Sequence, residues 1–185
     1  MDVLGCKKLS YIWTEPRPLC VVPSRLQFYT LSQVGEAAFI ALIAQVMAQS
    51  LDMHDQHMIE HVGVEAAAHQ MFHAARPAYD YQPEWWVIGS DMTGNTVGFV
   101  QPVIFPGCNR DGLEEGTIYY IGVAPQYRGY QYSYDLLCQA TANLQQVGVW
   151  RIYCDTDVNN IPMQQTFTRV GYETDRTVRE YALAP

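Results

Sequence analysis

The sequence predicts a layered fold of helices packed on a β-sheet, of the α/β or α+β class, and three observations support this. Apolar residues recur at helical spacing over an early part of the chain. Short apolar runs typical of strands follow, and two further helical patterns interrupt them. Hydrophobic residues make up 49% of the 185 residues and charged residues 16%, which is too apolar for intrinsic disorder and sufficient for a sizeable core.

Length and charge narrow the class of protein. A domain typically has about 100–150 residues, so one domain is expected. The formal net charge of -8 argues against a nucleic-acid partner, because such proteins usually present a basic face. The longest strongly apolar run, AAFIALIA, is far shorter than the roughly 18 residues that a membrane span needs, and no signal peptide is evident. These features favour a cytoplasmic protein without a membrane partner.

The cysteines agree with that compartment. They are odd in number and no two share a C-x-x-C spacing, so neither a metal ribbon nor a disulfide framework is predicted. Reduced thiols are expected instead. The five positions are Cys6, Cys20, Cys108, Cys138 and Cys154.

The first part of the chain is expected to hold extended segments and then two helices. Leu9–Trp13 and Leu19–Val22 flank a proline-containing turn and predict a β-hairpin or two extended segments. Ser32 is a candidate helix cap, and helical spacing continues to about Ser50. A second helix is predicted from about Asp55 to Ala75, with Gly63 weakening its middle.

The later part is expected to form most of the sheet. A helix over Tyr130–Val147, with Gly148 suited to its C-terminal cap, and a short helix over Ile161–Val170 lie between the strands. The predicted strands are Trp85–Ile88, Val97–Phe105, Thr117–Val123, Trp150–Thr156 and Tyr172–Leu183.

The segment VAPQYRGYQYS, residues 123–133, carries the first chemical signal. A strand ends at Val123, a tight loop follows, and a helix opens at about Tyr130. The N-terminus of a helix presents free N–H groups and a positive dipole end, which suit an anion such as a pyrophosphate. Gly129 allows the backbone to approach a ligand closely, and Arg128 adds a permanent cation. An ordinary strand–loop–helix turn with a surface arginine is the alternative.

A second segment, NIPMQQTFTRVGY at residues 160–172, completes a resemblance. Together the two segments resemble the GCN5-related N-acetyltransferase (GNAT) family. That family carries V-x-P-x-[YFW]-R-[GR]-x-G-x-[GA] and later N-x-x-A-x-x-x-Y-x-x-x-G-[FY]. Here the patterns become these two segments at matching internal spacing, with departures at Gln131, Ser133, Met163 and Phe167. The order of predicted elements over roughly residues 19–183 also fits.

The resemblance implies a single GNAT-like domain over residues 1–185. Its sheet would be mixed and mostly antiparallel, with helices on both faces. Residues 1–30 would form an N-terminal extended segment, and residues 31–76 the helices on the substrate side. The implied activity is acetyl-CoA-dependent transfer of an acetyl group to a primary amine of a small molecule or peptide, without a metal. Dimers are frequent in this family. A non-catalytic acyl-CoA-binding or sensing module of the same fold is the alternative.

The resemblance also assigns residues to the acyl donor, and three of them depart from the family pattern. Ser133 replaces a glycine or alanine and is small enough to be tolerated. Gln131 replaces a glycine of the loop, where it would either crowd the pyrophosphate or donate to it. Phe167 replaces a tyrosine that bonds the leaving thiolate in many members. A thiolate is stable enough to leave without full protonation. The residues assigned to the donor are Ile121, Val123, Gln126, Arg128, Gly129, Tyr130, Gln131, Tyr132, Ser133, Asn160 and Phe167.

The attacking amine must lose a proton, so a base is needed. Asp155 is the first candidate, because its spacing to Asn160 matches a glutamate that serves as base in ribosomal-protein alanine acetyltransferases of this family. A surface aspartate on a strand is the alternative. Glu115 and its neighbour Glu114 are second choices or solvated loop charges. Tyrosines on the predicted strands are candidate acids or packing residues, namely Tyr119, Tyr120 and Tyr153.

Two further groups stand outside the resemblance. His57 to His61 read H-x-x-E-H, a spacing that zinc proteases use on a helix, but no third ligand is identifiable. A solvated or amine-facing histidine cluster is favoured over a metal site. Tyr79 and Tyr81 are candidates for an acceptor pocket, whereas Trp85 and Trp86 are expected in the core.

Overall fold

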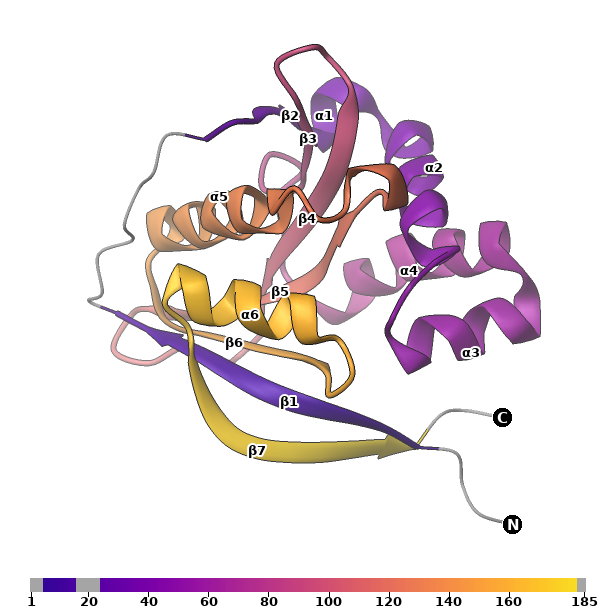
Figure 1. The fold of residues 1–185 in the computed structure, drawn as a ribbon. Helices are drawn as coiled ribbons and strands as arrows, with labels where there is room; N and C mark the ends of the chain where they lie inside the picture. Colours follow the sequence, from indigo (N-terminus) through magenta and orange to yellow (C-terminus); the bar gives the residue numbers. More distant parts are fainter. Residues whose placement is uncertain (1–4, 16–23, 183–185) are drawn as a thin grey trace.

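A computed structural model of the chain describes residues 5–15 and 24–182 (Figure 1). Its sheet has seven strands in the order β2-β3-β4-β5-β6-β1-β7. All neighbours are antiparallel except β5 and β6, which run parallel, so the predicted mixed and mostly antiparallel sheet is confirmed. The strands are β1 (Gly5–Thr14), β2 (Gln27–Thr30), β3 (Val87–Ser90), β4 (Thr96–Ile104), β5 (Glu114–Val123), β6 (Val149–Asp157) and β7 (Glu173–Ala182).

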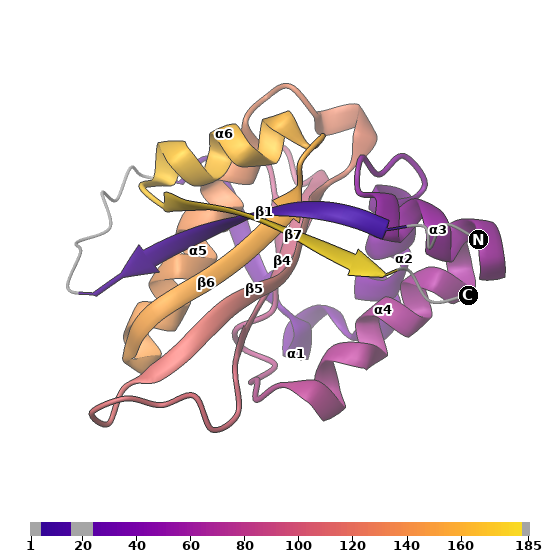
Figure 2. The same cartoon turned by 90° about the horizontal axis from the view of Figure 1, so that it is seen from below.

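Helices cover both faces of this sheet (Figure 1 and Figure 2). On one face, α2 and α4 enclose a core with side chains of β3 and β4. On the opposite face, α5 and α6 enclose the second core. The helices are α1 (Leu31–Val34), α2 (Glu36–Met47), α3 (Met53–Val62), α4 (Val64–Ala78), α5 (Tyr132–Val147) and α6 (Ile161–Val170), with a 3-10 turn at Pro125–Tyr127.

Each of the two early helices is divided at a glycine. The helix predicted from Ser32 breaks at Gly35, and the helix predicted from Asp55 begins earlier, at Met53, and breaks at Gly63. The two glycines have φ angles of +79° and +80°, a backbone region that glycine enters without steric cost. The chain therefore changes direction at each glycine, and α3 and α4 are two separate helices instead of one continuous helix.

Leu9–Trp13 was expected as one strand of a hairpin or as an extended segment, and the structure shows it in a strand. It lies within β1, and β1 pairs with β6 and β7, with Tyr11 opposite Cys154 and Leu9 opposite Val178. The predicted partner, Leu19–Val22, lies outside the described residues. Tyr11 and Trp13 are buried in the core on the α5 and α6 side.

The parallel pair is short, and this positions the site. The strands β5 and β6 pair only where Glu114 to Gly116 face Val149 to Ile152. Beyond Gly116 the two strands separate, which frees main-chain groups on the facing edges of both.

Candidate functional site

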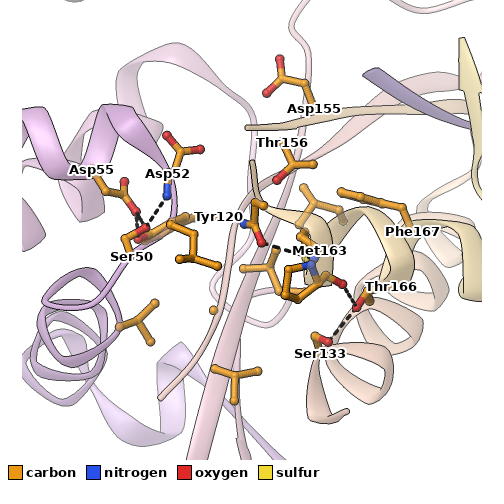
Figure 3. Close-up of a pocket in the computed structure, with 18 of the residues that line it drawn as sticks. Ser50, Asp52, Asp55, Tyr120, Ser133, Asp155, Thr156, Met163, Thr166 and Phe167 are labelled. Atoms are coloured by element: carbon orange, nitrogen blue, oxygen red, sulfur yellow. Dashed lines mark hydrogen bonds between the residues drawn. The ribbon is translucent and has the colours of Figure 1, made fainter. Parts of the chain in front are cut away.

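A cavity of about 1040 Å³ opens where β5 and β6 separate. Figure 3 shows side chains from both sides of the sheet converging on it, with Asp52 and Asp55 across from Met163 and Phe167. We call the part lined by Val123, residues 127–129 and 131–133, Asn160 and Phe167 the loop half. The part lined by Lys8, Asp52, Asp55, Tyr120 and Asp155 is the carboxylate half.

The loop half is built on the β5–α5 loop, residues 124–131. Gly129 has a φ angle of +85°, and Gln131, the residue before α5, has a φ angle of +63°. This path turns the chain sharply, so the first turn of α5 faces the cavity with Tyr132 and Ser133 on its wall. The first N–H groups of a helix have no partner within the helix, and they are available here to an anion.

The side chain of Gln131 is hydrogen-bonded to α6. Its side-chain oxygen accepts a hydrogen bond from the guanidinium of Arg169 on α6, and Arg169 also lies over the Tyr134 ring, 4.6 Å from its centroid. The amide is thus held towards α6. The two roles considered for Gln131, crowding the pyrophosphate or donating to it, stay predictions.

Arg128 is engaged with the chain itself. Its guanidinium donates to the carbonyl oxygens of Val123 at 3.1 Å, Gln49 at 2.6 Å and Val46 at 3.1 Å. Two of these carbonyls lie at the C-terminal end of α2, where the helix dipole favours a cation. The arginine expected to face an anion therefore ties the β5–α5 loop to α2.

Most residues assigned to the donor line the cavity. Asn160 also caps α6, since its side chain accepts from the Met163 N–H at 3.3 Å. Phe167 is 2% exposed and stacks on Tyr11 with ring centroids 4.8 Å apart. The residues on the cavity wall are Ile121, Val123, Arg128, Gly129, Gln131, Tyr132, Ser133, Asn160 and Phe167, whereas Gln126 and Tyr130 are exposed beside it.

The carboxylate half contains Asp155, the predicted base. Its side chain accepts a hydrogen bond from the Tyr181 hydroxyl at 3.0 Å and lies 3.9 Å from the Lys8 ammonium. Lys8 also forms an ion pair with Asp52 at 3.0 Å. Burial lowers the pKa of Lys8, but Asp52 and Asp155 outweigh burial and the net shift is upward. The lysine therefore stays charged and holds two carboxylates at the cavity wall.

Asp55 is a second carboxylate in this half, and the sequence did not indicate it. The residue is 2% exposed, and its Oδ2 accepts hydrogen bonds from Ser50 Oγ at 2.6 Å and from the Tyr120 hydroxyl at 2.7 Å. Burial raises the pKa of Asp55, and a buried carboxylate with a raised pKa in a cleft is a candidate for proton transfer. Asp55 and Tyr120 are 65 positions apart in the chain, so no local pattern joins them.

The second-choice base lies elsewhere. Glu115 is buried at the paired end of β5 and forms an ion pair with Arg151 at 2.6 Å, outside the cavity wall. Of the candidate acids, Tyr119 and Tyr153 join Tyr120 on the wall. The Tyr119 hydroxyl donates to the Met71 carbonyl at 3.0 Å, and burial raises the pKa of Tyr119 to about 12.

The remaining candidates are placed as follows. The rings of His57 and His61 are 4.0 Å apart, and within residues 5–15 and 24–182 no three His, Cys, Asp or Glu side chains are grouped to hold a metal ion. Tyr79 lines the cavity and packs against Tyr119, whereas Tyr81 stacks on Trp86. Trp86 is fully buried in the core, as expected.

Two general expectations concern the whole chain. Four of the five cysteines fall within the described residues, and these four are free thiols. Among the described helices, none is long and apolar enough to cross a membrane.

Comparisons with known proteins agree with this geometry. Residues 48–172 match the model of the acetyltransferase (GNAT) family. A GCN5-related N-acetyltransferase from Sphaerobacter thermophilus is 14% identical with a TM-score of 0.62, covering 97% of this chain and 52% of that one. A GNAT-family acetyltransferase from Colwellia psychrerythraea is 13% identical with a TM-score of 0.61, covering 98% of this chain and 57% of that one. An acetyltransferase from Trypanosoma brucei is 16% identical with a TM-score of 0.54, covering 83% of this chain and 97% of that one.

The chain spans about half the length of the first two structures, and at such identities the similarity shows the fold alone. No curated protein matches the sequence.

Proposed function

Since this chain belongs to the acetyltransferase (GNAT) family, we propose that it is an acetyl-CoA-dependent N-acetyltransferase acting on a primary amine. The observation that carries the proposal is one continuous cavity with an anion-binding loop in one half and carboxylates in the other. The amine nitrogen attacks the thioester carbonyl carbon, the carbon–sulfur bond breaks, and CoA leaves as a thiolate. The proton of the amine passes to a base of the protein.

The donor occupies the loop half in this proposal. Its pyrophosphate takes the N–H groups between Gly129 and Ser133, where loop and helix N-terminus face the cavity. Its pantetheine arm lies along the edge of β5 that the separation from β6 leaves free, next to Ile121 and Val123. An N–H group on that edge near Val123 also stabilises the charge that develops on the carbonyl oxygen.

The acceptor occupies the carboxylate half. A protonated amine is attracted by Asp52, Asp55 and Asp155, and the rings of Tyr79 and Tyr119 add a favourable surface for a cation. We assign proton removal to Asp155, which lies on the cavity wall with Lys8 3.9 Å away. Asp55 is the second carboxylate able to do this, because its other oxygen, Oδ1, is not one that Ser50 or Tyr120 bonds.

A non-catalytic acyl-CoA-binding module is the second candidate, and Phe167 is the observation that favours it. This ring has no hydroxyl to donate to a leaving thiolate, and it packs between Tyr11 and Tyr172. The carboxylate half of the cavity, with its ionisable side chains, favours the enzyme instead.

Two measurements test the proposal. Acetyl-CoA should raise the thermal unfolding temperature under both candidates, because a ligand that binds only the native state stabilises it. Release of free CoA thiol in the presence of a panel of primary amines is expected only from an enzyme. Absence of both responses would contradict both candidates, and thermal stabilisation without thiol release over a broad panel would favour the binding module.

A further inference from the structure

An arginine that precedes β2 in the sequence, Arg25, donates hydrogen bonds to the β5–α5 loop. Arg25 is outside the region 48–172 that the family model matches. Its guanidinium donates to the Tyr130 carbonyl oxygen at 3.0 Å and to the Gln131 carbonyl oxygen at 3.2 Å. A segment more than a hundred residues away in the chain thus fixes the residues that open α5.

Arg25 is itself fixed by a buried carboxylate. Asp135, in the first turn of α5, has a side chain that is 5% exposed. Its Oδ2 accepts from Arg25 Nε at 3.2 Å and Nη2 at 2.5 Å, and its Oδ1 accepts from the Arg25 backbone N–H at 3.0 Å. The guanidinium also lies over the Tyr132 ring, 5.0 Å from its centroid. Only the planar fork of an arginine makes these contacts together.

The geometry of the peptide bond gives these contacts a consequence. In a planar trans peptide, the carbonyl of one residue and the N–H of the next point in opposite directions. Because the carbonyls of Tyr130 and Gln131 point to Arg25, the N–H groups of Gln131 and Tyr132 point away from it. Both of these residues lie on the cavity wall.

The loop also needs such support. Gln131 has a φ angle of +63°, which is uncommon for a residue with a side chain and persists only where the surroundings fix it. Arg25 bonds the carbonyl of this same residue.

We propose that Arg25 is a positioning residue that keeps two N–H groups of the β5–α5 loop directed at the donor pyrophosphate. The inference rests on the proposed use of acetyl-CoA. It adds that productive donor binding depends on a residue of the N-terminal part of the chain, and that this dependence is specific to donors carrying the pyrophosphate.

The test compares dissociation constants for acetyl-CoA and for acetyl-pantetheine, which has the same thioester without the pyrophosphate and nucleotide. For Arg25→Gln we expect acetyl-CoA to bind about tenfold or more weakly, in line with lost hydrogen bonds of a charged group. Acetyl-pantetheine should bind as it does to the wild type. Arg25→Lys keeps the charge without the fork, and its acetyl-CoA constant should fall between the two.

Arg76→Gln is the matched control. Arg76 pairs with Glu36 and lies over the Phe72 ring, away from the cavity wall, so both constants should stay at their wild-type values. Wild-type protein that binds no acetyl-CoA would overturn the proposed function and this inference together. Wild-type protein that binds acetyl-CoA, with Arg25→Gln binding it equally well, would overturn the positioning role alone.

Equal weakening of both donors would also overturn the inference, because it would mean that Arg25 only supports the fold. Circular dichroism of each variant checks that fold. If Arg25→Gln does not fold, the Arg25→Lys variant carries the same comparison of the two donors.

Discussion

Asp155 lies on the cavity wall between the Lys8 ammonium and the Tyr181 hydroxyl, and its proposed role can be measured directly. Asp155→Asn keeps the shape of the side chain and removes its basicity. We expect kcat to fall about 10²–10⁴-fold, the usual contribution of a general base, with acetyl-CoA affinity nearly unchanged. The residual rate should rise with pH, because more of the amine is then already neutral. Steady-state kinetics with an accepted amine provides the readout.

The control for this substitution is Asp111→Asn, which makes the same carboxylate-to-amide change at a side chain that is 88% exposed. It should leave kcat unchanged. A fall of less than threefold in the Asp155→Asn variant, with an intact fold, would mean that Asp155 only holds Lys8. Asp55 would then be the carboxylate to test for proton removal.

Phe167 gives a second prediction at this scale. Phe167 lines the cavity although it is only 2% exposed, so Phe167→Tyr adds a single hydroxyl to a mostly buried ring at the cavity wall. We expect normal folding and turnover that equals or exceeds the wild-type rate. A large drop in the unfolding temperature would show instead that the ring edge lies in a dry core without a hydrogen-bond partner.

Asp55 predicts a pH dependence of stability. Burial places its pKa in the folded protein above the ordinary value of 3.8, so the protonated form is favoured by folding. The stability linked to this group is complete below the unfolded pKa and is lost as pH rises through the folded pKa. Relative to Asp55→Asn, the wild-type unfolding temperature should therefore decline as pH rises from about 4 towards neutrality. A constant difference between the two proteins across that range would contradict the assignment.

At the scale of elements, the β5–α5 loop depends on one glycine. Gly129 has a φ angle of +85°, and a Cβ there would meet no atom within 4 Å. In Gly129→Val the strain of a β-branched residue in this backbone region adds to obstruction of the ligand. We expect acetyl-CoA binding to be lost in calorimetry. Gly94→Val is the control, because Gly94 has a φ angle of +87°, equally open surroundings and a place in the β3–β4 turn.

Gly94→Val should lose stability but keep acetyl-CoA affinity. If the two variants bind acetyl-CoA equally well, the loop has no part in donor binding. If both lose it, the effect comes from general destabilisation.

The elements themselves were predictable where local patterns decide them. The strand–loop–helix unit around Gly129 and the short helix capped by Asn160 follow from residues close together in the chain. The helix breaks at Gly35 and Gly63 were less predictable, because a glycine only permits a positive φ angle and packing selects it. The place of β1 between β6 and β7 depends on pairing across most of the chain, which no local pattern encodes.

At the scale of the whole molecule, the functional site also has one part that local sequence predicts and one part that depends on distant packing. The loop half was predicted from two sequence segments, since backbone N–H groups follow from secondary structure. Of the carboxylate half, Asp155 was predicted as the base and Tyr120 was named as a candidate acid or packing residue. Lys8 and Asp55 reach the cavity because β1 and α3 are packed beside distant strands, and Arg128 was assigned to the ligand although its donors reach α2.

The place of β1 yields a prediction for the whole molecule. In the described residues β7 pairs with β1, and β1 with β6, so β1 joins the last strand to the rest of the sheet. Loss of one large buried aromatic side chain typically costs about 3–5 kcal/mol, against a total stability of about 5–15 kcal/mol. Removal of β1 takes away both Tyr11 and Trp13, which are 4% and 1% exposed.

A chain that begins at residue 24 should therefore lose cooperative thermal unfolding, as followed by circular dichroism, even though it retains the whole region that matches the family model. A synthetic peptide of residues 5–15 added in excess should restore the transition, because it supplies the missing strand. The same peptide with Trp13→Ala should restore it poorly. If the shortened chain unfolds at the wild-type temperature without peptide, β1 is dispensable and the later strands close the sheet without it.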